Sequence, residues 1–121
     1  MSFKIDIHPS NTLRIIFSGR VTGEELRSVR ENARAIVRAN ELKQIYCDLQ
    51  GAFLDIKQIE LFNYAASNKK IYQNILKTAI VYSEEKHDIG DLSMYAKAAN
   101  RRGFKVRLFI NGPEASKWLK H

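Results

Sequence analysis

An amphipathic helix pattern between two strand patterns constrains the fold of this chain more than any other feature. Over residues 23–40, apolar side chains recur at helical spacing and place one apolar stripe along the helix. A strand pattern precedes this helix, and another, over residues 43–49, follows it. A strand, helix and strand in this succession predict a right-handed crossover between parallel strands. The stripe consists of Leu26, Val29, Ala33, Ile36 and Val37.

The residues before this helix predict a hairpin that leads into it. Residues 3–8 alternate polar and apolar side chains with period two, and residues 13–17 resume a strand after the turn-forming segment 9–12. We expect residues 18–21 to leave the second strand. Thr22, with Glu25 three residues later, has the spacing of a capping box that begins the helix.

The rest of the chain repeats the alternation of helix and strand. After the strand at 43–49 we expect a helix capped by Asp55, a strand at 76–82, a helix ended by Gly103, a strand at 104–110 and a short helix from Gly112-Pro113. The predicted order is ββαβαβαβα, an α/β fold with one mixed, mostly parallel sheet in a single domain over residues 1–121. The apolar faces of the three later helices are Ile56, Ile59, Phe62 and Ala66; Leu92, Tyr95, Ala96 and Ala99; and Ala115, Trp118 and Leu119.

The stretch 47–57 reads as a short buried strand, a turn and the start of a helix. In open α/β sheets, binding sites lie just beyond the ends of such strands. Phe53 and Leu54 are bulky apolar residues in this expected turn, so they either pack beneath the next helix or form an exposed surface. Packing in the core is the simpler interpretation, and the alternative is a hydrophobic groove or lid formed with Ile56, Ile59 and Phe62.

Composition and length favour a cytoplasmic protein. With 121 residues, of which 45% are hydrophobic, the chain can bury the core of one domain. Cys47 is the single cysteine, which excludes an internal disulfide framework, and its apolar strand context predicts an inert buried thiol. The start of the chain alternates charge with apolarity, and no segment has the roughly 18 continuous apolar residues of a membrane span.

The net charge of +7, from 20 Lys and Arg against 13 Asp and Glu, favours weak attraction to anionic partners. Arg27, Arg30, Arg34 and Arg38 form one stripe on the first helix and could lie on an anionic membrane surface. Pairing with nearby glutamates makes a solvated helix face the simpler interpretation. No specific nucleic-acid binding is expected, because the aromatic residues fall at apolar-periodic positions rather than beside basic clusters.

No catalytic constellation is readable from the sequence. It has no glycine-rich phosphate loop and no Ser-His-Asp or Cys-His pairing at a recognisable spacing. His8, His87 and His121 are too widely separated for metal-ligand spacing, and the acidic neighbours of His87 predict a solvated loop. We therefore predict no catalytic residue, no metal and no cofactor, and expect that the chain is not an enzyme.

The order of elements resembles the STAS fold of anti-anti-sigma factors and of the cytoplasmic tails of sulfate transporters. More narrowly, the chain is similar to the SpoIIAA-like family of small, stand-alone bacterial proteins. The resemblance spans the whole chain, and three short segments carry it. They are Gly19-Arg20-Val21-Thr22 with Glu24-Glu25-Leu26, Asp48-Leu49-Gln50-Gly51 with Asp55, and residues 106–109 with Glu114-Ala115 and Trp118-Leu119.

The sequence departs from the family pattern where a phosphate switch would be. In phospho-regulated STAS proteins, a strand ending in Asp-Leu leads to Asp-Ser-Ser or Asp-Ser-Thr at the helix start, and a serine there accepts phosphate. Here Asp48-Leu49 and Asp55 are present, with a spacing one residue short, but Ile56 and Lys57 follow Asp55. Because phosphoryl transfer needs an attacking oxygen, the resemblance does not carry over the phosphoserine switch.

Two functional hypotheses follow, and a third, an unrecognised enzyme, would require convergent polar groups around a pocket. The first is a non-catalytic STAS-like regulatory module that binds a protein partner, or itself as a homodimer, through the central turn and the second helix. The second, from another class, is a binder of an apolar ligand such as a lipid, or of an anionic membrane surface. The candidate partner- or ligand-binding residues are Gln50, Phe53, Leu54, Asp55, Ile56, Ile59 and Phe62.

Overall fold

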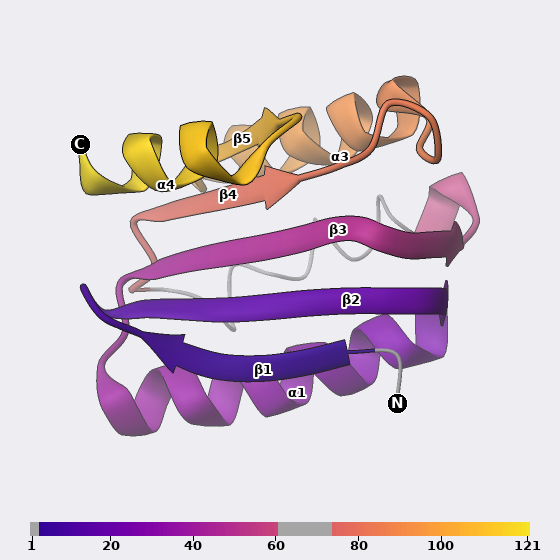
Figure 1. Ribbon diagram of the computed structural model, residues 1–121. Helices are drawn as coiled ribbons and strands as arrows, with labels where there is room; N and C mark the ends of the chain where they lie inside the picture. The colour runs from indigo at the N-terminus through magenta and orange to yellow at the C-terminus, as the bar shows by residue number, and fades with distance from the viewer. Residues whose placement is uncertain (1–2, 61–73) are drawn as a thin grey trace.

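A five-stranded mixed sheet forms the centre of the computed structural model, which describes residues 3–60 and 74–121 (Figure 1). The strands lie in the order β1-β2-β3-β4-β5. β1 pairs antiparallel with β2, and all other neighbours are parallel. This confirms the predicted mixed, mostly parallel α/β fold. The strands are β1 Phe3–His8, β2 Thr12–Thr22, β3 Gln44–Asp55, β4 Lys77–Val81 and β5 Val106–Phe109.

The helices are α1 Gly23–Asn40, α3 Ile89–Arg101 and α4 Gly112–Lys120. α1 and α3 cover one face of the sheet, and α4 covers the other. The apolar stripes of α1 and α3 pack with inward residues of β2 and β3 in the main core, which confirms both stripes. On the other face α4 covers β4, where Ala115 and Leu119 pack with Ala79 and Val81. No helix in the described residues is long and apolar enough to cross a membrane.

The predicted capping box begins α1. The Thr22 hydroxyl accepts a hydrogen bond from the Glu25 amide at 3.3 Å, and a Glu25 carboxylate oxygen accepts one from the Thr22 amide at 3.3 Å. The helix spans the predicted residues, and its C-cap residue is Glu41, whose φ of 50° is left-handed. These local bonds satisfy amide groups that the first helical turn leaves without a partner.

The prediction for the ends of β2 and β3 is wrong, because both strands are longer than expected. Residues 18–21 stay in β2 although Gly19 takes a φ of 68°. β3 continues through the expected turn as far as Asp55, and its last residue pairs with Thr22 at the end of β2. The two extended strands support each other, and this long-range pairing overrides the local turn signals at Gly19 and Gly51.

A β-bulge interrupts the pairing of these two strands. Ile16 pairs with Asp48 and Ser18 pairs with Gly51, so two residues of β3 stand opposite one residue of β2. Because side chains alternate between faces, one extra residue exchanges the faces of all later residues in β3. Leu49 points into the main core before the bulge and Ala52 points into it after the bulge.

The second helix starts later than predicted. Asp55 belongs to β3, and the helical residues begin at residue 58. The Lys57 amide donates a hydrogen bond of 3.2 Å to the Glu60 carboxylate, so the capping interaction at this start does not involve Asp55. The predicted inward residues Phe62 and Ala66 lie outside the described residues.

Candidate functional site

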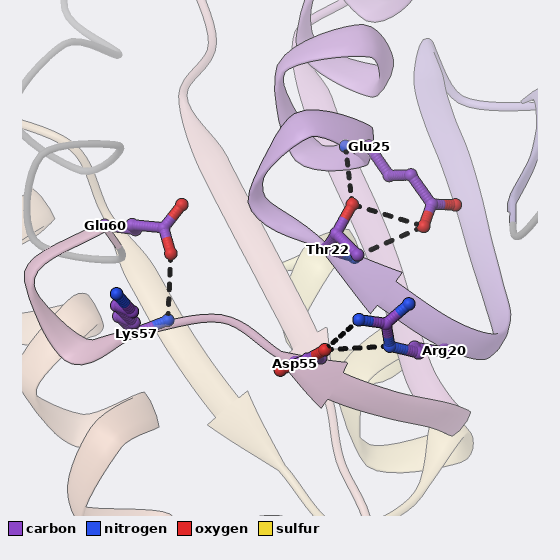
Figure 2. Close-up of polar contacts among 6 residues, drawn as sticks. All are labelled: Arg20, Thr22, Glu25, Asp55, Lys57 and Glu60. Atoms are coloured by element: carbon purple, nitrogen blue, oxygen red, sulfur yellow. Dashed lines mark hydrogen bonds and ion pairs between the residues drawn. The ribbon is translucent and has the colours of Figure 1, made fainter.

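The C-terminal ends of β2 and β3 form the candidate site, together with the start of α1 and of the second helix (Figure 2). Phe53 and Leu54 face opposite sides of the sheet here. Leu54 packs against the main core, whereas the side chain of Phe53 is 62% exposed. Core packing, the simpler interpretation, is therefore right for Leu54 and wrong for Phe53, and the bulge is the physical reason.

Arg20 and Asp55 form an ion pair beside Phe53. The Arg20 Nε donates to the Asp55 Oδ2 at 2.8 Å, and Nη2 of the same guanidinium contacts the same oxygen. Arg20 pairs directly with Phe53 in the register of β2 and β3, so all three residues lie on one face at the strand ends. Both charged side chains are largely exposed, so solvent weakens the pair and leaves it able to exchange partners.

Glu60 connects the start of the second helix with the start of α1. Its Oε1 accepts the Lys57 amide, and its Oε2 lies so close to Gly23 that a Cβ on residue 23 would overlap it. A carboxylate at a helix N-terminus is stabilised by the helix dipole and by free amide groups. Figure 2 shows Glu60 and Lys57 on one side of Asp55, and Arg20, Thr22 and Glu25 on the other.

The segment after β4 closes the free edge at the end of β3. β4 pairs with β3 only as far as Asp48, so among the described residues β2 is the only strand that pairs with the later residues of β3. Lys86 Nζ donates to the Gln50 carbonyl at 3.3 Å, and the His87 ring bonds the Ala52 carbonyl at 2.9 Å. These two side chains thus occupy the position where a further strand would pair.

His87 is buried, so the prediction of a solvated loop is wrong for this residue. Its Nδ1 accepts the Ser83 amide hydrogen at 2.9 Å, which leaves the ring hydrogen on Nε2 to be donated to Ala52. The acidic neighbours in sequence gave no signal of this role, because the Ala52 contact comes from a strand more than thirty residues away.

The remaining candidate residues are distributed around this centre. Ile59 is 62% exposed, Ile56 is half-buried against the core, and Gln50 is exposed with its side-chain amide 3.4 Å from the Ile110 carbonyl. Phe62 lies outside the described residues. On α1, Arg27 and Arg38 are exposed, Arg30 is half-buried, and Arg34 approaches Glu31 at 4.0 Å. Whether any of these residues binds a partner, ligand or membrane stays a prediction.

An apolar cavity lies under the helices on the main-core side. Its volume is about 90 Å³, and its walls come from the sheet, α1 and α3. Cys47 lies in this wall, and burial raises the pKa of its thiol to about 12, so the thiol is protonated at neutral pH. Leu26, Leu54, Ile56, Tyr95 and Phe104 are the partly buried apolar residues of the wall near the helices.

A second hollow, of about 430 Å³, lies between α4 and the other face of β1–β3. The Asp6 carboxylate accepts two hydrogen bonds from Arg14, at 2.9 and 2.7 Å. The hydrogen bonds from Arg14 lower the pKa of Asp6 from its usual value. Within residues 3–60 and 74–121, no cluster of His, Cys, Asp and Glu has an arrangement that could hold a metal ion.

Solved structures with the same architecture place the chain in a fold class. It superposes on an uncharacterised DUF3478-family protein with a SpoIIAA-like fold from Shewanella loihica PV-4 with a TM-score of 0.63 and 13% identity, covering 97% of this chain and 91% of the other. The anti-sigma factor antagonist SpoIIAA in its unphosphorylated form gives 0.64 and 8%, covering 98% and 97%. An anti-sigma factor antagonist from Mycobacterium paratuberculosis gives 0.65 and 14%, covering 98% and 93%.

This chain therefore has the SpoIIAA-like STAS fold, as its sequence pattern predicted. No family model and no curated protein matches the sequence. At these identities the likeness establishes the fold, and function has to be argued from the site.

Proposed function

We propose that this chain is a non-catalytic regulatory module that binds a protein partner, or a second copy of itself, through the C-terminal ends of β2 and β3. The binding surface has Phe53 at its centre, with Arg20 and Asp55 beside it. Two structural neighbours are anti-sigma factor antagonists, which supports a regulatory role that works through protein contacts.

The observation that carries this proposal is the exposure of Phe53 on a strand that is paired along its length. An aromatic ring held on a rigid strand loses little conformational freedom when a partner covers it. Burying such a side chain contributes roughly 1.5–3 kcal/mol. The adjacent Arg20–Asp55 pair offers both signs of charge at the rim, which suits an interface in which an apolar centre is surrounded by polar groups.

The same surface lacks the chemistry of a phosphate switch. Residues 53–60 contain no serine, threonine or tyrosine, so no side-chain hydroxyl follows Asp55 at the start of the second helix. We propose that regulation at this surface depends on binding alone, without phosphorylation at that turn. Among the described residues, the polar groups at the site bond to one another or to backbone, which fits recognition better than catalysis.

Substitution Phe53→Asp tests this proposal. It should weaken partner capture, or self-association measured by sedimentation velocity, by at least about tenfold, because it replaces the ring that the partner would bury with a charge. Ile7→Asp is the matched control, since Ile7 is 51% exposed on β1 near the other end of the sheet. A monomer without any captured partner, or equal loss in both variants, would contradict the proposal.

The second candidate function is binding of a small apolar ligand, favoured by the apolar cavity that Cys47 lines. Its volume of about 90 Å³ is below the roughly 150 Å³ of a cavity that accepts benzene. A ligand with an acyl chain would therefore need Leu54 and Ile56 to move outward. Native mass spectrometry of the purified chain should then detect an added mass that organic extraction removes, and a bare mass in repeated preparations would argue against this function.

A further inference from the structure

One end of the molecule gathers basic residues from many segments of the chain. The parallel strands β3, β4 and β5 begin at this end, and helices α1, α3 and α4 finish there (Figure 1). In the described part of the chain, Glu41 is the only acidic residue at the ends of these helices and the starts of these strands. The basic end, as we call it, comprises the exposed residues Arg38, Lys43, Arg101, Arg102, Lys105, Lys117 and Lys120.

The centre of the basic end is a row formed by the residues that immediately precede three neighbouring strands. The Leu76 amide donates to the Lys43 carbonyl at 2.7 Å, and the Thr78 amide donates to the Lys105 carbonyl at 2.8 Å. Because adjacent strands lie about 4.8 Å apart, Lys43 and Lys105 flank Leu76 within roughly 10 Å. Leu76 is 65% exposed, and both lysines are exposed.

Helix stability accounts for only part of this arrangement. Basic residues in the last turn, such as Arg38 and Arg101, are favoured by the negative end of the helix dipole. Lys43 and Lys105 lie beyond the helices, at the starts of strands, where the dipole gives no comparable reason. Nor does it explain why Leu76, a large apolar side chain, stands exposed between them.

We infer that the basic end binds the surface of an anionic lipid bilayer. Lysine and arginine side chains would contact the lipid phosphates and carboxylates, while Leu76 would enter the boundary between head groups and acyl chains. A combination of basic residues with an exposed apolar side chain is what such a surface favours. A nucleic acid would pair with the basic side chains but leave Leu76 in water. The aromatic rings at this end, Phe104 and Trp118, are partly buried in the protein and are therefore poorly placed to stack on bases.

The basic end is separate from the surface that we propose for partner binding. The proposed partner-binding surface lies at the opposite end of β3, so either proposal can fail without the other. The arginine stripe of α1 shares Arg38 with the basic end, whereas Arg27 lies near the other end of that helix. Arg27 and the exposed Lys97 in the middle of α3 therefore supply a control with the same change of charge.

Co-sedimentation of the full chain with vesicles tests the inference. We expect binding to vesicles of phosphatidylcholine with phosphatidylserine, no binding to phosphatidylcholine alone, and weaker binding as salt rises above about 0.1 M. Arg102→Glu with Lys105→Glu should weaken binding at least roughly 25-fold, at about fivefold for each cation removed. Leu76→Ser, which leaves the charge unchanged, should weaken it severalfold.

The control variant, Arg27→Glu with Lys97→Glu, should bind clearly better than the variant of the basic end. Thermal unfolding followed by circular dichroism must show that all variants fold. Absence of binding at low salt, or an equal loss in the two charge variants, would overturn the inference. Full binding by Leu76→Ser would also overturn it, and would reassign the surface to a soluble polyanion such as nucleic acid.

Discussion

Phe53 and Leu54 are neighbours in the chain whose different surroundings come from one inserted residue. Leu49 and Gln50 stand opposite Phe17 alone, and the shift in β3 turns Leu54 inward and Phe53 outward. The Asp48 side chain helps to hold this geometry, because its Oδ1 accepts the Gln50 amide at 2.9 Å. A single carboxylate thereby fixes the backbone where the two faces of the strand exchange.

Replacing Asp48 should loosen the bulge in a way that depends on the acceptor oxygen. We expect Asp48→Ala to lower the free energy of unfolding by about 1 kcal/mol, because the Gln50 amide loses its partner. Asp48→Asn keeps an acceptor oxygen in the same place and should retain most of the stability. Urea unfolding measures both variants, and an equal loss in both would show that the charge, rather than the hydrogen bond, matters.

The sequence could not reveal the direction of Phe53. Its spacing from Ile45, Cys47 and Leu49 is even, so an uninterrupted strand would have placed it in the core. The bulge depends on how β3 pairs with β2, a segment some thirty residues earlier, and this register leaves no local pattern. The exposed Phe53 therefore follows from a tertiary relation that propensity and periodicity do not contain.

Among the elements, β3 has the most unusual surroundings. Its first half lies between β2 and β4, and its second half has β2 on one side and the segment after β4 on the other. Lys86 and His87 bond the carbonyls of Gln50 and Ala52, two residues apart, as a neighbouring strand would. An open strand edge of this kind otherwise invites pairing with another chain.

Removal of the His87 ring should expose this edge. We expect His87→Ala to lower the free energy of unfolding by about 2 kcal/mol, since it leaves the Ser83 amide and the Ala52 carbonyl without partners. The variant should also scatter more light as protein concentration rises, because the freed edge can pair between molecules. His8→Ala, at an exposed position on β1, is the control, and identical scattering by the two variants would contradict this role of His87.

At the scale of the whole molecule, the order of elements was predictable from the sequence. The helix at 23–40, the hairpin before it and the later strand and helix alternation leave periodic patterns that each element carries by itself. The capping box at Thr22 is equally local and was predicted correctly. The sequence-based predictions were wrong or missing where pairing between distant segments determines the structure. These features are the lengths of β2 and β3, the bulge, and the burial of His87.

In the candidate site too, residues close in sequence were predicted correctly, whereas contacts between distant elements were not. Gln50, Phe53 and Asp55 were predicted to lie near one another because they are close in sequence, and the strand end holds them together. Arg20 and Glu60 were not predicted to join them. Arg20 contacts Asp55 on another strand, and Glu60 lies close to Gly23 at the start of α1, so both contacts connect different elements. A crossover fold brings such residues to one edge of the sheet, but the partners become known only when the register is known.

The parallel arrangement of β2 to β5 has a geometric consequence for a protein that docks on a surface. β3 is twelve residues long, so its two ends lie about 35 Å apart. A molecule attached through Lys43, Leu76 and Lys105 would stand upright, with Phe53 facing away from the support. In that orientation, occupation of one end leaves the other accessible, which is the requirement for an adaptor that recruits a second protein to a fixed location.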